Sequence, residues 1–187
     1  MTVAQHRLTF QDFEAFLLTG IEGPWELHDG ILVEKSGMSW EHQNVIAELV
    51  RLLGNQLPYD QYRVQAESLA RQFAATVFRP DVMVIPTQYG RQFRNQPGRL
   101  VIIDAPLPLV VEVWSRSTGR YDVAAKLPVY QQRGDVEIWL IHPYERTITA
   151  WRRQEDGSYA ESRFTDGEIT PVALPGVSID LAAIFRE

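Results

Sequence analysis

Three ionisable residues stand at positions where neighbouring elements would bring them together: Asp81, Glu112 and Lys126, separated by 31 and 14 residues. Two carboxylates on adjacent strands are stable side by side only with a cation between them or a shared proton. Hard oxygen donors in a chain without cysteine indicate magnesium or manganese rather than zinc. Two carboxylates, such a metal and a lysine could hydrolyse a phosphodiester bond. The spacing is also compatible with a structural role, in which Asp81 caps the turn after Pro80 and Glu112 pairs with an arginine.

The segment that would position Glu112 and Lys126 begins as a β-branched apolar run, Leu109–Trp114. Such a run predicts a strand covered on both faces, so Glu112 in its middle needs a partner. After a polar turn, apolar residues recur at helical spacing over Tyr121–Arg133, with Gly134 as a C-terminal stop. The sequence therefore predicts a strand carrying a carboxylate followed by a helix carrying an ammonium.

Lysine is scarce in this chain. Of the 18 basic residues only Lys35 and Lys126 are lysine. An ammonium is a compact charge whose pKa moves readily, which suits catalysis better than the fixed fork of arginine. A chemical role for Lys126 and a solvated helix lysine both fit this observation.

Composition limits the classes of protein to consider. A length of 187 residues and 45% hydrophobic content predict one domain spanning residues 1–187. The absence of cysteine excludes disulfides and thiolate metal sites. The N-terminal residues form no signal peptide, and no apolar run is long enough to cross a membrane, so a cytoplasmic protein with no membrane partner is expected. The net charge of −6 argues against coating nucleic acid through bulk charge, although a local basic groove remains compatible.

Turn residues and periodicity predict the remaining elements. Helices are expected over Phe10–Leu18 with Thr9 as N-cap, Trp40–Gln56 with Ser39 as N-cap, and Leu181–Phe185 with Asp180 as N-cap. Strands are expected over Trp25–Leu27, Ile31–Glu34, Tyr62–Ala66, Val77–Ile85, Glu137–Ile141, Thr147–Arg152 and Tyr159–Phe164. Four prolines and two glycines between Pro86 and Pro108 predict a long loop with one short strand, Leu100–Ile103.

This order of elements predicts an α/β (α+β) fold: a mixed central sheet flanked by helices, with an N-terminal edge hairpin and a C-terminal β hairpin. The strand, helix and strand from Leu109 to Ile141 are expected to form a parallel crossover unit. Function must be argued from a site rather than from this layout.

Three further residues are accessory candidates. His42 opens the second helix and could reach the carboxylates, although histidines at helix starts are more often partly exposed. Glu48 lies on the same helix and has a surface role as its alternative. Tyr130, one turn after Lys126, fits packing better than chemistry.

Several stretches resemble one known family. Asp81 after Pro80, followed by the strand with Glu112, is similar to the PD-(D/E)xK nuclease pattern. The segments WELHDGILVEKSG, EHQ, RPDVMVI, PLVVEVWSRST and VEIWLIHP resemble the Uma-type restriction endonuclease family, over about Leu8 to Arg153 and into the tail motif LPGVSIDL. The resemblance implies a restriction-endonuclease-like fold and a Mg²⁺ site, with Mn²⁺ as an alternative. It assigns the metal to Asp81, Glu112 and the Val113 carbonyl, and the catalytic lysine to Lys126.

Two positions depart from the family pattern. The superfamily lysine two residues after the glutamate is Trp114 here, so its role would fall to Lys126. The usual Ser-Pro-Ser-Thr turn carries Arg116 in place of proline. Arg116 and Arg120 are the predicted DNA contacts, and Arg116 is also compatible with a solvated position.

Three functions remain open from the sequence. The first is a metal-dependent DNA endonuclease that acts as a homodimer, because cutting both strands of a two-fold target needs two sites. The second is a catalytically silent nucleic-acid-binding or regulatory module on the same fold. The third is a metal-free small-molecule binder in a cleft beside the sheet. The set of Asp81, Glu112 and Lys126 favours the first.

Overall fold

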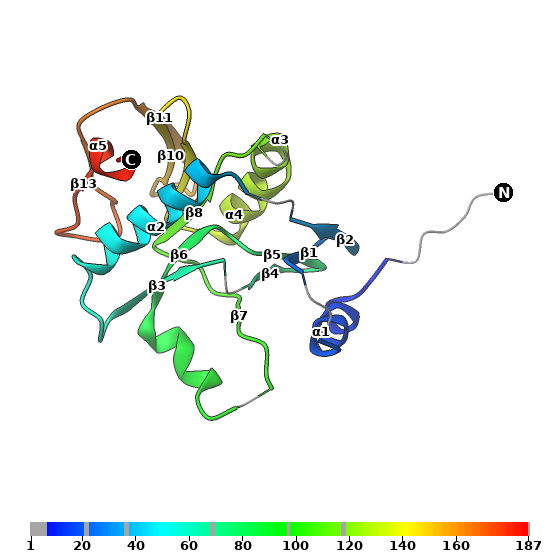
Figure 1. The fold of residues 1–187 in the computed structure, drawn as a ribbon. Coiled ribbons are helices and arrows are strands. Elements are labelled where there is room, and N and C mark those ends of the chain that lie inside the picture. Colours follow the sequence, from blue (N-terminus) through cyan, green and yellow to red (C-terminus); the bar gives the residue numbers. More distant parts are fainter. Residues whose placement is uncertain are drawn as a thin grey trace.

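The computed structural model describes residues 7–20, 23–35, 38–67, 70–96, 98–116 and 119–186. Two larger sheets organise these residues (Figure 1). The six-stranded sheet has the order β11-β10-β9-β8-β6-β3, and the five-stranded sheet has the order β2-β1-β5-β4-β7. A third, two-stranded sheet pairs β12 with β13.

The strands of the six-stranded sheet are β3 Tyr62–Ala66, β6 Val82–Pro86, β8 Leu109–Val113, β9 Glu137–His142, β10 Thr147–Arg153 and β11 Tyr159–Phe164. Those of the five-stranded sheet are β1 Trp25–His28, β2 Ile31–Glu34, β4 Ala70–Phe73, β5 Thr76–Phe78 and β7 Ile102–Ile103. The short pair is β12 Glu168–Ile169 and β13 Ile179–Asp180. The helices are α1 Phe10–Leu18, α2 Trp40–Gly54, η1 Thr87–Phe93, α3 Gly119–Tyr121, η2 Asp122–Lys126, α4 Leu127–Arg133 and α5 Leu181–Ile184.

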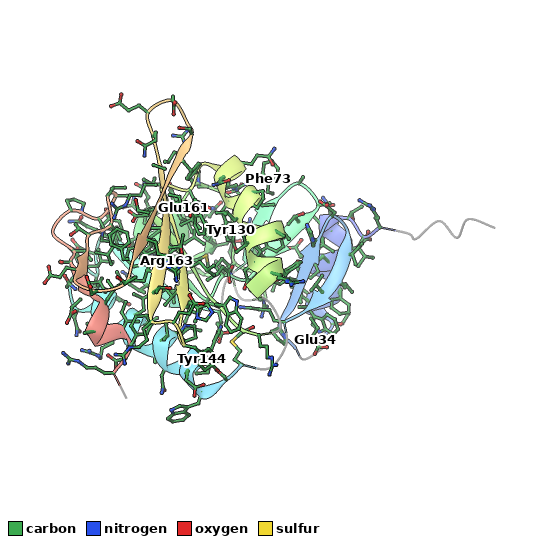
Figure 2. All side chains as sticks on the ribbon, turned by 90° about the horizontal axis from the view of Figure 1, so that it is seen from above. Glu34, Phe73, Tyr130, Tyr144, Glu161 and Arg163 are labelled. Atoms are coloured by element: carbon green, nitrogen blue, oxygen red, sulfur yellow. The ribbon has the colours of Figure 1, made fainter. Side chains whose placement is uncertain are left out.

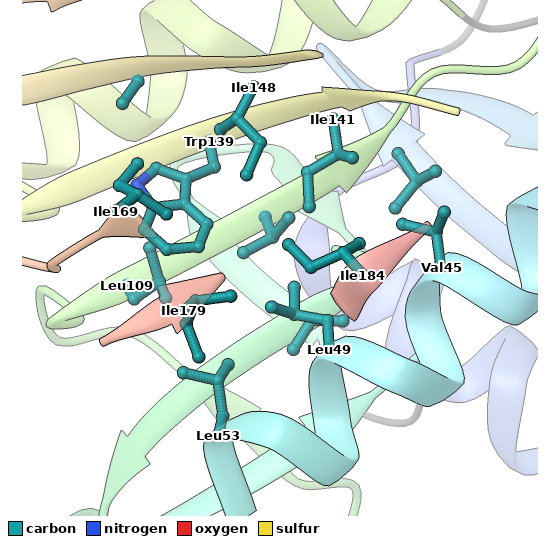
Figure 3. Packing of buried hydrophobic residues seen from close by; sticks show 14 of the residues in the cluster. Val45, Leu49, Leu53, Leu109, Trp139, Ile141, Ile148, Ile169, Ile179 and Ile184 are labelled. Carbon is teal, nitrogen blue, oxygen red and sulfur yellow. The ribbon is translucent and has the colours of Figure 1, made fainter. Parts of the chain in front are cut away.

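Helices cover both faces of the six-stranded sheet. On one face, α2 and α5 pack on the apolar side chains of β6, β8, β9 and β10, around Leu49, Val111 and Trp139 (Figure 3). On the other face, Tyr130 of α4 packs with Met83 and Val110. Because side chains alternate along a strand, Glu112 points to the same face as Val110, toward α4.

The five-stranded sheet lies at the opposite end of the molecule from α5 and β13 (Figure 1). It packs against α1 through a small core of Phe13, Leu27 and Val77. The expected hairpin at His28-Asp29-Gly30 is confirmed, with His28 opposite Ile31. This hairpin reaches the six-stranded sheet at the candidate site described below.

Local capping signals are confirmed. Thr9 and Asp12 form a reciprocal capping box on α1, and Ser39 accepts a hydrogen bond from the His42 N–H at the start of α2. Gly134 ends α4 in the left-handed conformation at φ 81°. The expected helix over Tyr121–Arg133 is present, but its first part, η2, is a π-helical turn.

The predicted strand Val77–Ile85 is wrong in one respect: it is two strands, β5 and β6, which belong to different sheets. Apolar residues stand on both sides of Arg79-Pro80-Asp81, but Pro80 has no N–H to give to a ladder, so the chain leaves one sheet and enters the other there. The long loop after Pro86 contains the 3₁₀ helix η1 besides the expected short strand. Strand β4 was not predicted.

The mixed character of the central sheet is confirmed. Strands β8 and β9 run parallel, with Glu112 opposite Leu140, whereas β8 pairs antiparallel with β6. Within the described residues no helix has the length and apolar character needed to span a membrane.

Candidate active site

Asp81 and Glu112 meet at the end of the β6–β8 pair. Val82 lies opposite Val111 in the antiparallel register, so the next pair in the same register would be Asp81 and Glu112. Both carboxyl groups are buried. The expected juxtaposition of the two carboxylates is therefore a consequence of strand register rather than of proximity in sequence.

Every oxygen of Asp81 has a partner. Lys35 Nζ lies 2.6 Å from Oδ1, while the Val113 N–H donates to Oδ2 at 2.7 Å and His42 Nε2 lies 3.3 Å from Oδ2. Burial by itself would raise the pKa of Asp81, but the hydrogen bond from His42 and the charge of Lys35 hold this pKa well below its usual range. Asp81 is thus a stable carboxylate anion.

Glu112 has the opposite character. The Tyr130 hydroxyl donates to Oε1 at 2.6 Å, and Lys126 Nζ lies 3.3 Å from Oε1 and 3.4 Å from Oε2. Burial raises the pKa of Glu112 well above its usual value; Lys126 opposes this rise, and the charges of Asp81 and Asp122 add to it. The site therefore stabilises the ionised form of Asp81 and disfavours the ionised form of Glu112.

Lys126 lies among three carboxylates. Its Nζ is 3.0 Å from Glu26 Oε1 and 3.4 Å from Asp122 Oδ1, besides its contact with Glu112. Asp122 and Lys126 stand four residues apart in the π-helical turn η2, which the Leu127 N–H closes on the Asp122 carbonyl. Burial alone would lower the pKa of Lys126, but the surrounding carboxylates raise it well above its usual value.

Three site residues, Glu26, Lys35 and Asp122, escaped the sequence prediction. Glu26 and Lys35 come from the β1–β2 hairpin and the residue after it. Glu26 of β1 is fully buried; its Oε1 accepts from the Arg79 N–H at 2.8 Å, and its Oε2 has no hydrogen-bond partner among the described residues. Lys35 donates to the Arg79 carbonyl at 3.0 Å as well as to Asp81. The scarcity of lysine that singled out Lys126 applied equally to Lys35.

The charges of this cluster do not balance. Glu26, Asp81, Glu112 and Asp122 supply four negative charges when ionised, and Lys35 and Lys126 supply two positive ones, which leaves a formal charge of −2. One divalent cation would neutralise it. The oxygen donors suit Mg²⁺ or Mn²⁺, and the unpaired Glu26 oxygen is a further hard donor, so the residues fit such an ion. In the described part of the chain, no three carboxylate or imidazole groups already stand at metal-binding spacing.

The structure brings together most of the predicted site residues. His42 and Tyr130 join Asp81, Glu112 and Lys126, as described above. Glu48 does not: it lies on the surface of α2 and pairs with Arg51 at 2.7 Å. Arg116 and Arg120 are exposed, on the turn after β8 and on α3.

Solvent reaches the cluster on the Lys35 side. A hollow of about 520 Å³ there is lined by Pro24, Glu34, Lys35, Met38, Gln43, Glu67 and Arg79. In Figure 2, Tyr130 points into the middle of the molecule, whereas Glu34 lies at its rim.

Comparisons with known proteins agree with this architecture. A family model named Uma2 and described as "Putative restriction endonuclease" matches residues 10–182. A solved structure described as a "putative nuclease belonging to DUF820", from Anabaena variabilis, has a TM-score of 0.76 and 19% identity, with coverage of 95% of this chain and 97% of that chain. At this identity the likeness shows the fold alone. No curated protein matches the chain.

Proposed function

Because the chain belongs to the Uma2 family of putative restriction endonucleases, we propose that it is a metal-dependent endonuclease that hydrolyses phosphodiester bonds in DNA. The observation that carries the proposal is the pairing of Asp81 and Glu112 on adjacent strands with Lys126 against Glu112. Carboxylates with an ammonium alongside suit a reaction in which negative charge grows on phosphate oxygens.

In this proposal Asp81, Glu112 and the Val113 carbonyl would hold Mg²⁺, or Mn²⁺ in its place. The bound ion would supply a water of lowered pKa and charge neutralisation at the phosphate. The other residues position these ligands. Tyr130 fixes Glu112 by donating to Oε1, and the Val113 N–H and His42 fix Asp81.

Lys126 has the role of the catalytic lysine in this proposal. Glu26 and Asp122 hold its ammonium beside Glu112, so it stays charged where a phosphate would approach. Arg116 and Arg120, both exposed near this end of β8, are the proposed contacts to the DNA backbone.

The catalytically silent module remains the second candidate, because one observation favours it. Lys35, Val113 and His42 together engage both oxygens of Asp81. A carboxylate whose two oxygens are both paired with protein groups could have a purely structural role.

Nicking of supercoiled plasmid with Mg²⁺ tests the proposal. We expect the parent protein to nick and Glu112→Gln to lose nicking, while Glu155→Gln, the same change at an exposed residue of the β10–β11 hairpin, leaves the rate unchanged. Equal nicking by the Glu112 variant would reject the assigned site. A folded parent without activity would favour the silent module.

The third candidate, a metal-free small-molecule binder, makes a different prediction. Addition of Mg²⁺ without DNA should raise the melting temperature if the ion binds the native state alone. The absence of any shift at millimolar Mg²⁺, together with the absence of nicking, would favour that candidate.

The proposal includes a homodimer. One site of this kind cuts one strand, and a two-fold pair of sites cuts both. Strands β2 and β11 are edge strands of their sheets and could pair with a second copy. Light scattering that returns 21.4 kDa, the mass of one chain, with and without DNA would count against the dimer.

A further inference from the structure

Two large aromatic side chains are exposed beside the start of α2. Trp40 is 78% exposed and Tyr144, in the turn between β9 and β10, is 56% exposed. The Tyr144 hydroxyl lies 3.0 Å from Ser39 Oγ and 3.1 Å from Glu41 Oε2, the residues on either side of Trp40. The two aromatic residues therefore belong to one surface, and in Figure 2 Tyr144 stands at the rim of the molecule next to α2.

Two arginines line the hollow next to Trp40. This hollow, of about 410 Å³, includes Arg146, Phe185 and Arg186. The Arg146 guanidinium lies 5.7 Å from the centre of the Phe185 ring. Among the described residues neither guanidinium lies within 4.0 Å of a carboxylate, although Glu41 lines the same hollow and the charge of Arg186 acts on Glu48.

The backbone at Arg146 is strained. Its φ is 54°, in the left-handed region that costs a non-glycine residue about 1 kcal/mol or more. Asp29 and Ala74, in the β1–β2 and β4–β5 turns, also have positive φ, so this conformation belongs to the β9–β10 turn. Here it places a charged side chain in the hollow beside an exposed indole.

A row of rings connects this surface to the candidate active site. Tyr144 meets Trp114 edge to face at 6.1 Å between ring centres, and Trp114 stacks on His142 at 4.3 Å. Trp114 follows Glu112 by two residues. A Cβ at Gly119 would overlap the Trp114 indole, so this row of rings requires glycine at position 119. The exposed aromatic surface is thus continuous with the strand that carries the catalytic carboxylate.

We propose that Trp40, Tyr144, Arg146 and Arg186 bind an unpaired stretch of nucleic acid, with a base stacked on Trp40 and phosphates at the two arginines. The inference rests on the proposed nuclease function and names its substrate: DNA with unpaired bases beside the scissile bond. In a duplex each base face is covered by its neighbours, so an exposed indole finds a stacking partner only in single-stranded or flipped nucleotides.

Fluorescence anisotropy with a labelled single strand and a blunt duplex of equal length, in EDTA, tests this proposal. We expect Trp40→Ala to weaken single-strand binding by roughly five- to hundredfold, the effect of one stacked base, and to change duplex binding less than twofold. Arg146→Ala and Arg186→Ala should each lower the slope of log K against log salt by about 0.7. Single-strand binding should also quench indole fluorescence in the parent more than in Trp40→Ala.

Tyr59→Ala is the matched control. Tyr59 is 76% exposed and has Arg63 stacked on its ring at 3.4 Å, but it follows the other end of α2, about 20 Å from Trp40 along the helix. This variant should bind the single strand like the parent. All variants alter exposed side chains and should melt within a few degrees of the parent.

Three outcomes would overturn the inference. If the parent nicks plasmid and Trp40→Ala binds the single strand as tightly as the parent, the surface is not a strand-binding site although the nuclease proposal survives. If Trp40→Ala instead halves the mass measured by light scattering, the surface contacts a second copy of this chain. A parent that neither nicks nor binds either DNA would remove both proposals.

Discussion

Asp81 and Glu112 should respond in opposite directions when their charges are removed in metal-free protein. Asp81→Asn removes the charge that pairs with the buried Lys35 ammonium at 2.6 Å. Glu112→Gln keeps an oxygen to accept from Tyr130, and Lys126 keeps two other carboxylates. Asp81→Asn leaves the buried Lys35 ammonium without its nearest negative charge, whereas Glu112→Gln removes excess negative charge from the cluster.

The magnitudes follow from these contacts. Breaking a buried ion pair on one side costs about 3–5 kcal/mol, so the free energy of unfolding of Asp81→Asn should fall by about 3 kcal/mol. The raised pKa of Glu112 means that its ionised form opposes folding, so Glu112→Gln should raise the melting temperature. With about 2–4 °C per kcal/mol for a chain of this size, Asp81→Asn should melt about 6–12 °C lower.

The pH dependence has a definite sign for each residue. The folded pKa of Glu112 lies above its unfolded value of about 4.3, so its contribution to stability is full below that pH and is lost as pH rises through the folded pKa. The advantage of Glu112→Gln should therefore grow above about pH 4.3. The folded pKa of Asp81 is depressed, so its contribution is present above about pH 3.9 and is lost as pH falls through the folded pKa.

Thermal unfolding in EDTA between pH 5 and 9, followed by circular dichroism, measures both shifts. Glu155→Gln provides the baseline for loss of one surface carboxylate. Shifts of the same sign for Asp81→Asn and Glu112→Gln would refute the reasoning, because the two carboxyls would then share one electrostatic environment.

Three further perturbations test neighbouring contacts. Lys126→Arg should lose most nicking activity while it remains folded, because a planar fork cannot replace a compact ammonium; full activity would indicate a structural lysine. Tyr130→Phe should lower the free energy of unfolding by about 1–2 kcal/mol in urea titrations, since the buried hydrogen bond to Glu112 is lost; an unchanged midpoint would contradict that contact. Gly119→Ala should lower the melting temperature by several degrees, at a cost of about 1–3 kcal/mol, because its Cβ would overlap the Trp114 indole; an unchanged melting curve would show that the ring can move.

The elements that the sequence predicted well are those with local causes. The Thr9 and Ser39 caps and the hairpin turns at Asp29-Gly30 and Asp156-Gly157 each depend on residues within a few positions of one another. The parallel unit of β8 and β9 followed from the helix between them. Neither prediction required knowledge of distant contacts.

The division between β5 and β6 had only one local signal, Pro80 with the charged residues Arg79 and Asp81 on either side of it. The rest of the run from Val77 to Ile85 is apolar and buried, as in a single buried strand. Which sheet each half joins depends on partners far away: Val77 lies opposite Leu27, whereas Val84 lies opposite Leu109. Periodicity within a segment carries no information about such pairing.

The same distinction between local causes and distant partners explains which residues of the candidate site could be predicted from the sequence. The pair of Asp81 and Glu112 could be predicted because one assumption, that their strands are neighbours, was sufficient. Glu26 and Lys35 could not, because their places depend on how the five-stranded sheet meets the six-stranded one. Asp122 carried a local signal, its spacing of four residues from Lys126, which is an ion-pair spacing in a helix.

The site also forms the joint between the two sheets. The chain passes from β5 to β6 through Arg79 and Pro80, where backbone groups leave one ladder before they enter the next. Buried backbone groups need partners, and here the Arg79 N–H donates to Glu26 while its carbonyl accepts from Lys35. These two side chains also touch Lys126 and Asp81. The charges proposed for catalysis therefore also stabilise the crossing, which accounts for the burial of Glu26 and Lys35 at the junction where Asp81 begins the second sheet.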